Sequence, residues 1–426
     1  MLSMAQALER CLSAVLPVLP ERVALDRAFD RVLAQDIVSP IDVPPWNNSA
    51  MDGFALRAQD VQSDVPLRVL ETIAAGAMPT RVVQPGTCSR IMTGAPMPQG
   101  ADCVVMIERT RPGLDQASSD PARSDWVLID ESPKVGQNIR PQGGDVGTGD
   151  QVLQAGETMT PAAVAMVASL GFPSVLVAQA PRVAILGTGD EVIEPGFPRT
   201  PGQIYSSNTL ALMGMVRQAG GEPVHCGIAP DDPEGLRVAL DRCLRCDFVL
   251  STGGVSVGDF DHVKDVVGTL NFWKVAVKPG KPLAFGAVKG VPFFGLPGNP
   301  VSCMVNFLQF VRPVIRLSLG DPKPYLPVIE ARLTDPLRKR SGRAHLSRVI
   351  LSPGESGWLA TPTATQSSGV LMSMVLAHGL TLLPPDAGNQ AAGDLISVQV
   401  IRQDWGSAST PGYPWKDHAP LPDHGC

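Results

Sequence analysis

The chain reads Arg182-Val-Ala-Ile-Leu-Gly-Thr-Gly-Asp-Glu191, then Phe248-Val-Leu-Ser-Thr-Gly-Gly-Val-Ser-Val-Gly-Asp-Phe-Asp261, and then Phe293-Phe-Gly-Leu-Pro-Gly-Asn-Pro300. In each segment a short apolar run ends in a glycine cluster, which is typical of parallel strands whose carboxyl ends meet at one edge of a sheet. Glycine allows a sharp turn there and lets a ligand reach main-chain N–H groups without a Cβ in the way. We therefore predict a ligand site at this edge.

Three lysines follow in Phe272-Trp-Lys-Val-Ala-Val-Lys-Pro-Gly-Lys281. Lys274 and Lys278 are four residues apart, so we expect them to share one face of an extended strand. The Pro-Gly turn after Lys278 can bring Lys281 back toward them. Such a cluster suits a phosphate or another tetrahedral oxyanion, although lysines on an exposed edge strand give the same pattern.

Carboxylates also follow the predicted strands, at Glu191, at Asp231 and Asp232, and at Asp259 and Asp261. Each acid alone could be a turn or helix-capping residue. Their recurrence at several strand ends favours a shared metal site, because Mg²⁺ takes one or two carboxylates together with water and phosphate. The sequence thus predicts a site for a metal and an anion together.

Two other motifs have competing interpretations. Gly254-Val-Ser-Val-Gly258 matches the GxSxG nucleophile elbow of serine hydrolases, but no helix follows at once and no HGGG-type oxyanion loop exists. Asp261 with His345 or His378 keeps that alternative open. Cys243 and Cys246 form one CxxC, for which the simpler interpretation is two small residues at a helix end, because a structural zinc site needs a second ligand pair.

Composition narrows the class of protein. A length of 426 residues predicts about three domains. The net charge of −6 argues against nucleic-acid binding. No export signal or membrane span is expected, because prolines and glycines divide the apolar stretch 159–178. The eight scattered cysteines predict reduced thiols and a cytoplasmic location.

Segment patterns predict the following organisation. Residues 181–320 alternate strands and helices, which predicts a three-layer α/β domain. Short strands predict a small β-rich domain at 46–139 and a C-terminal β domain at 321–404. The predicted scaffold domain is discontinuous, with α+β elements at 1–45 and 140–180, and 405–426 is predicted to be a disordered tail.

Several motifs together resemble the MoeA family, the molybdopterin molybdenumtransferases, which are related to the gephyrin E domain. The motifs are Asn47-Asn-Ser-Ala-Met-Asp-Gly-Phe54, Arg90-Ile-Met-Thr-Gly-Ala-Pro-Met-Pro98, Gly100-Ala-Asp-Cys-Val-Val105, the three strand-end loops, and Lys278-Pro-Gly-Lys-Pro282. The resemblance runs from about residue 5 to 400. In one departure, His345-Leu-Ser-Arg348 stands where family members commonly carry an aromatic residue and more arginine.

The resemblance implies an elongated, four-domain homodimer with a MogA/MoaB-like central domain and a site near the subunit interface. It implies insertion of molybdate into adenylylated molybdopterin with release of AMP, and Mg²⁺ as the metal. The implied metal ligands are Glu191, Asp231 and Asp261. The implied catalytic residues are these three with Asp52, Lys274 and Lys278. The expected substrate contacts are Thr93, Asp145, Gly253, Gly254, Ser256, Lys281, Pro297, Pro300, Ser368 and Ser373.

Without a convincing activated nucleophile, the residues favour an electrostatic mechanism in which lysines orient molybdate and the acids hold Mg²⁺. One alternative is a molybdopterin adenylyltransferase of the MogA type, which shares the glycine-rich domain and could also be a partner. Another is a gephyrin-like scaffold without catalysis. Molybdate-dependent release of AMP distinguishes the first function from both.

Overall fold

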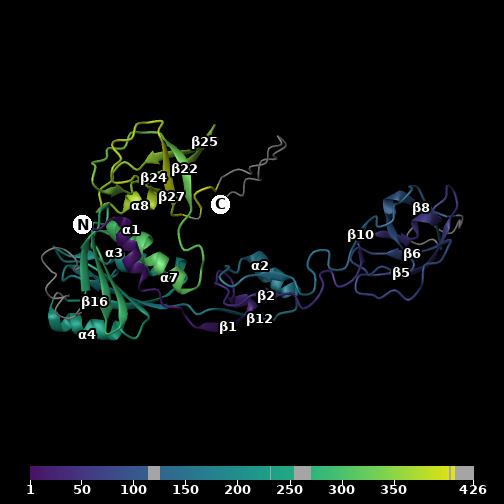
Figure 1. Ribbon diagram of the computed structural model, residues 1–426, viewed down its shortest axis with the longest axis horizontal. Coiled ribbons are helices and arrows are strands. Elements are labelled where there is room, and N and C mark those ends of the chain that lie inside the picture. Colours follow the sequence, from purple (N-terminus) through teal and green to yellow (C-terminus); the bar gives the residue numbers. More distant parts are fainter. Residues whose placement is uncertain (114–124, 231, 254–269, 403, 408–426) are drawn as a thin grey trace. The chain divides into compact units, whose positions relative to one another are not determined.

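The structure, a computed structural model, describes residues 1–113, 125–230, 232–253, 270–402 and 404–407. The chain divides into two compact units. Unit 1 contains Met1–Glu21 and Ala178–Cys426, and unit 2 contains Arg22–Val177 (Figure 1). Within the described ranges, no helix combines the length and apolar character that crossing a membrane requires.

The central sheet of unit 1 confirms the predicted α/β class. Its described strands lie in the order β16 (Glu222–Ala229), β13 (Arg182–Thr188), β17 (Phe248–Thr252), β21 (Val291–Leu296), β20 (Pro282–Val288) and β18 (Leu270–Lys274). The first four strands are mutually parallel, β20 pairs antiparallel to β21, and β18 pairs antiparallel to β20. All three quoted segments therefore contribute parallel strands, and β13, β17 and β21 are neighbours, so their carboxyl ends meet at one edge.

Helices flank this sheet where the sequence places capping signals. Asp232 caps α4 (Pro233–Cys243), because its side chain accepts a hydrogen bond from Gly235 N, and proline occupies the first turn. The apolar face of α4 packs on β13 and β16 in a core that includes Cys243 and Cys246. Further helices described between residues 181 and 320 are α3 (Ser207–Gln218), α6 (Pro300–Asn306), the π-helical turn η5 (Phe307–Val311) and α7 (Arg312–Ser318).

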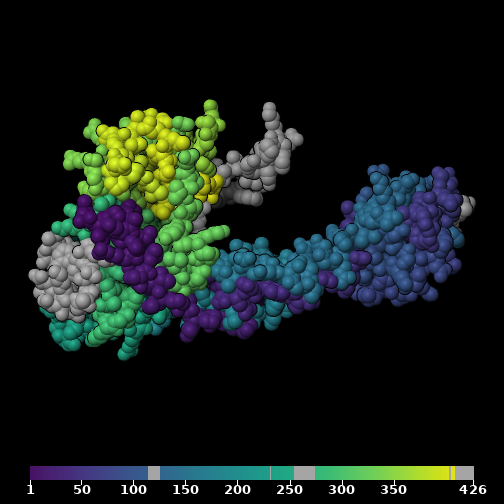
Figure 2. All heavy atoms as spheres, in the orientation of Figure 1, coloured from purple at the N-terminus to yellow at the C-terminus, as the bar shows by residue number. Residues whose placement is uncertain are grey.

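The N-terminal helix α1 (Met4–Leu12) belongs to unit 1, where it packs against η5 and α7. Ser3 and Gln6 form a capping box at its start. Beyond its end, Leu16 N donates to Ser318 Oγ at 3.2 Å. The sequence analysis grouped residues 1–45 with residues 140–180. The amphipathic pattern of the first helix predicts that one of its faces is buried, but it does not predict which part of the protein covers that face. Figure 2 shows the first residues, in purple, lying on the green surface of unit 1.

The lysine segment differs from the prediction. Strand β18 ends at Lys274, and Val275 N donates to Lys281 O at 2.7 Å, which closes a turn. Lys278 lies in a separate strand, β19 (Val277–Lys278), which pairs in parallel with β23 (Ala344–His345). The expectation that Lys274 and Lys278 share one strand face was therefore wrong, because the turn breaks the strand between them.

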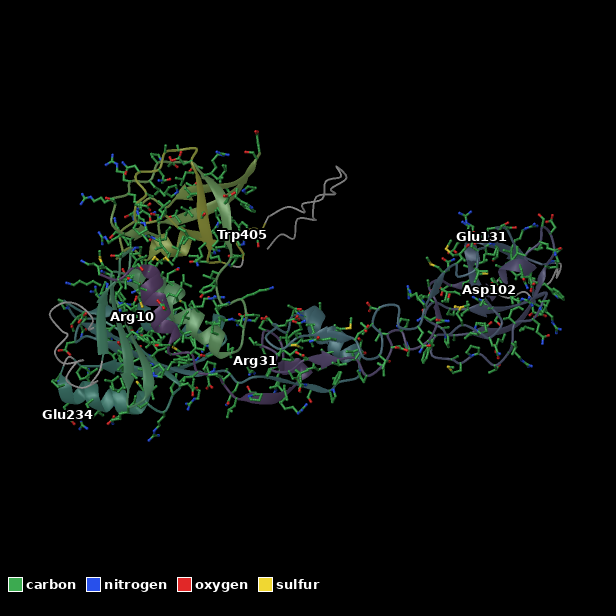
Figure 3. The ribbon with its side chains drawn as sticks, viewed as in Figure 1. Arg10, Arg31, Asp102, Glu131, Glu234 and Trp405 are labelled. Carbon is green, nitrogen blue, oxygen red and sulfur yellow. The ribbon has the colours of Figure 1, made fainter. Side chains whose placement is uncertain are left out.

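The C-terminal part of unit 1 is a closed barrel of β22 (Val328–Leu333), β25 (Gly357–Pro362), β24 (Arg348–Gly354), β26 (Gly379–Thr381) and β27 (Leu395–Val400). The short helix α8 (Met372–Leu376) contacts β24. Trp405, assigned from sequence to a disordered tail, instead packs on Trp358 with ring centroids 4.3 Å apart. Figure 3 shows Trp405 beside the barrel. Residues 408–426 lie outside the described residues.

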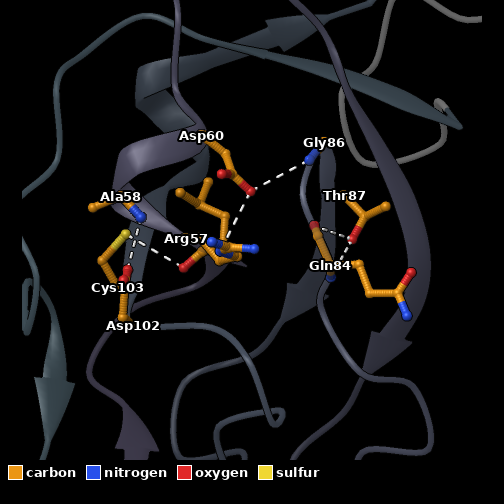
Figure 4. A network of polar contacts seen from close by, with 9 residues as sticks. Arg57, Ala58, Asp60, Gln84, Gly86, Thr87, Asp102 and Cys103 are labelled. Carbon is orange, nitrogen blue, oxygen red and sulfur yellow. Dashed lines mark hydrogen bonds and ion pairs between the residues drawn. The ribbon is translucent and has the colours of Figure 1, made fainter.

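Unit 2 contains a β sheet in the order β7 (Cys103–Met106), β4 (Gly53–Leu56), β6 (Thr87–Ile91), β5 (Leu67–Ile73), β9 (Trp126–Ile129) and β8 (Thr110–Pro112). Buried side chains cover this sheet in two clusters. Figure 4 shows how polar contacts hold its loops: Asp102 accepts from Ala58 N at 2.7 Å, and Asp60 accepts from Gly86 N at 3.3 Å.

A separate core of unit 2 joins two distant segments, because residues 28–37 pack with residues 159–177, as a discontinuous domain requires. The domain boundaries themselves stay a prediction. The remaining strand pairs described between residues 20 and 178 are β1 (Pro20–Ala24) with β12 (Ser174–Ala178), β2 (Ile37–Val38) with β11 (Gln151–Leu153), and β3 (Asn48–Ser49) with β10 (Ile139–Arg140). The helix of this part is α2 (Pro161–Ser169). Short 3-10 turns are η1 (Leu25–Arg27), η2 (Ala58–Asp60) and η3 (Ile107–Arg109).

Candidate active site

A cavity of about 560 Å³ opens at the carboxyl ends of β13, β17 and β21. We call it the strand-end cavity. The β14 (Val192–Ile193) and β15 (Ile204–Tyr205) pair and the start of α3 also line it. Its lining residues are Gly187, Thr188, Glu191, Val192, Ile204, Tyr205, Ser206, Ser207, Asn208, Thr252, Gly253, Pro282, Pro297, Gly298, Asn299, Pro300 and Gly369.

Gly253 shows why glycine ends the strand here. Its φ of +93° lies in the left-handed region, and a Cβ at this position would stand 2.7 Å from Thr188 O. Its N–H donates to Leu296 O at 3.2 Å, so the ends of β13, β17 and β21 are drawn together at this point. Any larger residue would force these ends apart.

Asn208, in the first turn of α3, fixes the loop on the other side of the cavity. Its Nδ2 donates to Thr252 Oγ1 at 2.9 Å and to Gly298 O at 2.7 Å. One side chain therefore joins the end of β17 to the loop that precedes α6. The positions of Gly298 and its neighbour Asn299 are fixed by this contact.

Glu191 is the only charged side chain among the described lining residues of the strand-end cavity. Its carboxylate folds back over Gly189, whose φ is +125°, and its Oε2 lies 2.6 Å from where a Gly189 Cβ would stand. Only a glycine at 189 leaves room for this conformation. Carboxylate oxygens are hard donors that suit Mg²⁺, so Glu191 fits the predicted metal as one ligand.

A second cavity, of about 600 Å³, lies between the turn at residues 275–281, which we call the lysine turn, and the C-terminal part of unit 1. We call it the lysine cavity. Three cationic side chains line it, and no acidic residue is among its described lining residues. The lining residues are Val277, Lys278, Pro279, Gly280, Lys281, Pro282, Asn299, Ser302, Arg343, Gln366, Ser367 and Ser368.

The lysine turn is held on both sides. Leu346 N donates to Lys278 O at 2.9 Å, which ties the turn to β23. Gly280, with φ of +103°, packs so closely on Asn306 that a Cβ would stand 2.1 Å from its Oδ1. Asn306 Nδ2 in turn donates to Pro282 O at 2.9 Å. The cations are therefore presented by a backbone that cannot easily move.

Arg348 supports the loop opposite the lysines. It is fully buried, its Nη2 donates to Ser367 O at 3.2 Å, and its Nε donates to Ser373 Oγ at 3.2 Å. Burial lowers the pKa of Arg348 to about 10. Ser373 donates onward to Val370 O at 2.7 Å. Ser373 thus braces the loop and does not line either cavity.

His345 lies behind the lysine turn, paired in register with Lys278. It is 5% exposed, and neither ring nitrogen has a hydrogen-bond partner among the described residues. Burial, followed by the positive charges of Lys278, Lys339, Arg348 and Arg343, lowers the pKa of His345 to about 4. The ring is therefore neutral at physiological pH and fills space as an aromatic side chain.

The two cavities adjoin, because Pro282 and Asn299 line both. The structure thus brings Glu191, Gly253, Pro297 and Pro300 to one cavity and Lys278, Lys281 and Ser368 to the next. Lys274 lines neither cavity. Asp231, Gly254, Ser256 and Asp261 lie outside the described residues, and so does the GxSxG motif.

The predicted site residues of unit 2 have their own arrangement. Asp52 accepts from Thr93 N at 2.7 Å and from Thr93 Oγ1 at 2.9 Å. These hydrogen bonds lower the pKa of Asp52. Asp145 is exposed, and its N–H donates to Val43 O at 3.0 Å. Asp52 and Thr93 therefore act as a pair, which their separation of 41 residues did not reveal.

Several lining residues escaped the sequence analysis. Arg343, Gln366 and Ser302 line the lysine cavity, and Asn208 and Asn299 line the strand-end cavity. The signal for Asn299 was present, since it lies inside a quoted glycine motif, but an asparagine before proline also starts a helix. For Arg343, 62 residues after Lys281, no local pattern indicated a contact.

The fold and the cavities together define a multidomain α/β protein with a cavity at the carboxyl edge of its central sheet and a C-terminal barrel. The chain belongs to the MoeA family. Residues 2–171 match the MoeA N-terminal region (domain I and II), 184–317 match the probable molybdopterin binding domain, and 330–401 match the MoeA C-terminal region (domain IV).

Individual relatives agree with this assignment. A molybdopterin molybdenumtransferase 2 of Mycobacterium tuberculosis is 38% identical, over 89% of this chain and 94% of its own. A molybdopterin molybdenumtransferase of Haemophilus influenzae is 36% identical, over 94% and 98%. The crystal structure of a molybdopterin biosynthesis moeA protein from Pyrococcus horikoshii OT3 superposes with a TM-score of 0.80 at 29% identity, covering 94% of this chain and all of that one.

Proposed function

We propose that this chain is a molybdopterin molybdenumtransferase, which inserts molybdate into adenylylated molybdopterin and releases AMP. The names of the full-length relatives support this activity. The observation that carries it is the pair of adjoining cavities, one lined by glycine turns and a carboxylate and the other by three cations. A reaction between a nucleotide-tagged pterin and an oxyanion needs two such cavities side by side.

The lysine cavity is the proposed molybdate site. Molybdate is a tetrahedral dianion, and Lys278, Lys281 and Arg343 supply positive charge that no described carboxylate in the lining neutralises. The hydroxyls of Ser302 and Ser368 can donate to its remaining oxygens. The hydrogen-bond donors of the lysine cavity lie on a fixed backbone, so the protein needs little reorganisation when the anion binds.

The strand-end cavity is the proposed site for the adenylylated pterin, with Mg²⁺ held by Glu191 and, as the family resemblance implies, by Asp231 and Asp261. When bound, Mg²⁺ supplies a Lewis acid that polarises the phosphoanhydride. Gly253 lets the ends of β13 and β17 pack closely beneath this cavity, and Asn208 keeps the opposite loop in place. The proposed role of Glu191 is to hold the metal where the AMP leaving group departs.

We also propose that Asp52, Thr93 and Asp145 complete the site from the partner subunit of a homodimer. A test mixes an Asp52→Ala variant with a Lys278→Ala variant under conditions that exchange subunits. If one site combines two chains, mixed dimers regain one intact site and activity rises to about a quarter of wild type. If each site lies within one chain, the mixture stays inactive.

The chain could instead catalyse the preceding reaction, the adenylylation of molybdopterin, or it could be a scaffold without catalytic activity. An adenylyltransferase would release pyrophosphate from ATP and molybdopterin, whereas a scaffold would release nothing. The retained glutamate and lysines favour catalysis. We place the protein in the cytoplasm, with a MogA-type enzyme as the partner that supplies its adenylylated substrate.

The direct experiment incubates the purified protein with adenylylated molybdopterin, molybdate and Mg²⁺ and measures AMP. We expect AMP release that requires both molybdate and Mg²⁺. Pyrophosphate from ATP and molybdopterin, without molybdate-dependent AMP release, would instead support the adenylyltransferase.

A further inference from the structure

Asn299 occupies the wall between the strand-end cavity and the lysine cavity. Of the described lining residues, only Asn299 and Pro282 belong to both cavities. A proline side chain carries no polar group, so Asn299 is the only shared residue whose side chain can hydrogen-bond. Its Oδ1 lies 3.8 Å from where a Cβ of Gly369 would stand, and Gly369 lines the strand-end cavity.

The helix that follows does not use this side chain. Asn299 occupies the N-cap position of α6, with φ −64° and ψ 122°, yet it makes no side-chain capping bond. Asparagine at an N-cap normally accepts a hydrogen bond from an amide two or three residues on. Here Pro300 has no N–H, and Val301 N donates to Ser368 O at 3.2 Å. The Asn299 amide has no hydrogen-bond partner among the described residues.

The backbone around Asn299 is nevertheless fixed. Its carbonyl accepts from Cys303 N at 2.9 Å, which begins the helix. The preceding carbonyl, of Gly298, accepts from Asn208 Nδ2 at 2.7 Å. An exposed amide on a rigid backbone between two cavities is prepared to bind a ligand without reorganising the protein.

We propose that Asn299 is a catalytic residue whose Nδ2 donates a hydrogen bond to the oxyanion in the lysine cavity, on the side that faces the strand-end cavity. This inference rests on the proposed function, in which both substrates are anions and repel each other where they meet. A neutral donor at the junction offsets that repulsion. It also turns one oxygen of the oxyanion toward the second substrate.

The test compares Asn299→Asp, Asn299→Ser and Asn299→Ala. Asparagine, aspartate and serine are similarly good N-cap residues, so the first two variants keep the helix start. Aspartate cannot donate and adds a negative charge, whereas serine can still donate. We expect AMP release to fall about 100-fold in Asn299→Asp and Asn299→Ala, the usual cost of losing one such donor, and to fall less in Asn299→Ser.

Asn389→Asp is the matched control. Asn389 is exposed in a barrel loop, lines neither cavity, and uses only its Oδ1, which accepts from Lys339 N at 2.8 Å. The Asn389→Asp substitution makes the same change of charge away from both cavities, and we expect this variant to release AMP at the wild-type rate. Wild-type rates in Asn299→Asp would overturn the inference, as would an equal loss in Asn389→Asp.

Calorimetric binding of molybdate alone separates this inference from the proposed function. We expect Asn299→Asp to bind molybdate about ten-fold more weakly than the wild type, with an unchanged urea midpoint. If the wild type binds molybdate but releases no AMP, the proposed function fails while the binding comparison still decides the role of Asn299. Equal molybdate affinity in Asn299→Asp and the wild type would contradict that role.

Discussion

The two cavities of unit 1 are similar in volume, about 560 and 600 Å³, but opposite in construction. The strand-end cavity presents main-chain groups at glycine turns and one carboxylate, Glu191. The lysine cavity presents Lys278, Lys281 and Arg343 from separate parts of the chain. The difference fits the proposal of two ligands of different chemistry, a nucleotide-tagged pterin with its metal in the strand-end cavity and an oxyanion in the lysine cavity.

The largest effect is expected for Lys278→Ala, which removes a cation from the lysine cavity. We expect kcat/KM for molybdate to fall about a thousand-fold, because the variant loses both a charge and a fixed donor to the oxyanion. Steady-state AMP release over a molybdate series measures this. Lys289→Ala, which removes a lysine paired with Asp241 on the surface, is the control.

The comparison breaks down if Lys278→Ala and Lys289→Ala have the same molybdate dependence. In that case the lysine cavity does not hold the oxyanion. An unchanged far-UV spectrum and urea midpoint in Lys278→Ala would show that the fold is intact and that the kinetics can be interpreted.

A smaller effect, about 100-fold on kcat, is expected for Glu191→Gln in the strand-end cavity. Glutamine keeps the shape of the side chain but loses the negative charge that would hold the proposed Mg²⁺, so higher Mg²⁺ should restore part of the rate. AMP release titrated with Mg²⁺ measures this. Glu234→Gln on the surface of α4, where Glu234 pairs with Arg237, is the control (Figure 3). A Glu191→Gln enzyme with a normal Mg²⁺ requirement would remove Glu191 from the metal site.

Arg348→Met should weaken molybdate binding in the lysine cavity while leaving the free energy of unfolding of the protein almost unchanged. Without the donor to Ser367 O, the loop at 366–368 loosens, and we expect the KM for molybdate to rise about ten-fold. The free energy of unfolding should change by about 1 kcal/mol or less, because the lost hydrogen bonds offset the removed cost of burying a charge. Urea unfolding and molybdate kinetics on one preparation measure both. A large loss of stability with an unchanged KM would give Arg348 a purely structural role.

The smallest effect is an acid sensitivity that comes from His345. Its pKa is about 4 when folded and about 6.5 when unfolded. The unfolded state therefore binds more protons between these values, and stability is full above pH 6.5 and falls as pH drops toward 4. His345→Phe should remove about 1 kcal/mol of the loss between pH 7.5 and 5.5. Urea unfolding at both pH values tests this, and equal pH dependence in the two proteins would contradict it.

The strand-end cavity could be predicted from sequence because its parts are local. A strand followed by glycines is encoded by consecutive residues. The strands β13, β17 and β21 lie where the quoted segments predict them. The strands β22 (Val328–Leu333) and β9 (Trp126–Ile129) likewise fall inside the two segments, 321–404 and 46–139, that short apolar runs predicted to be rich in β structure. In both cases neighbouring residues determine the outcome.

The lysine cavity could be predicted only in part. Lys278, Lys281 and Ser368 were identified, but Lys274 lines neither cavity, because a hydrogen bond between Val275 and Lys281 ends the strand. Arg343 and Gln366 reach the cavity through pairing between β19 and β23 and through the loop braced by Arg348. Contacts between residues so distant in the sequence depend on tertiary packing, and no periodic pattern in the sequence predicts them.

The most direct test of the two-cavity account measures AMP release by the wild-type protein from adenylylated molybdopterin, with molybdate and Mg²⁺ each varied while the other is saturating. The account predicts that each is required, that Lys278→Ala raises only the molybdate requirement, and that Glu191→Gln raises only the Mg²⁺ requirement. AMP release that is independent of molybdate, or two variants with the same altered requirement, would contradict it.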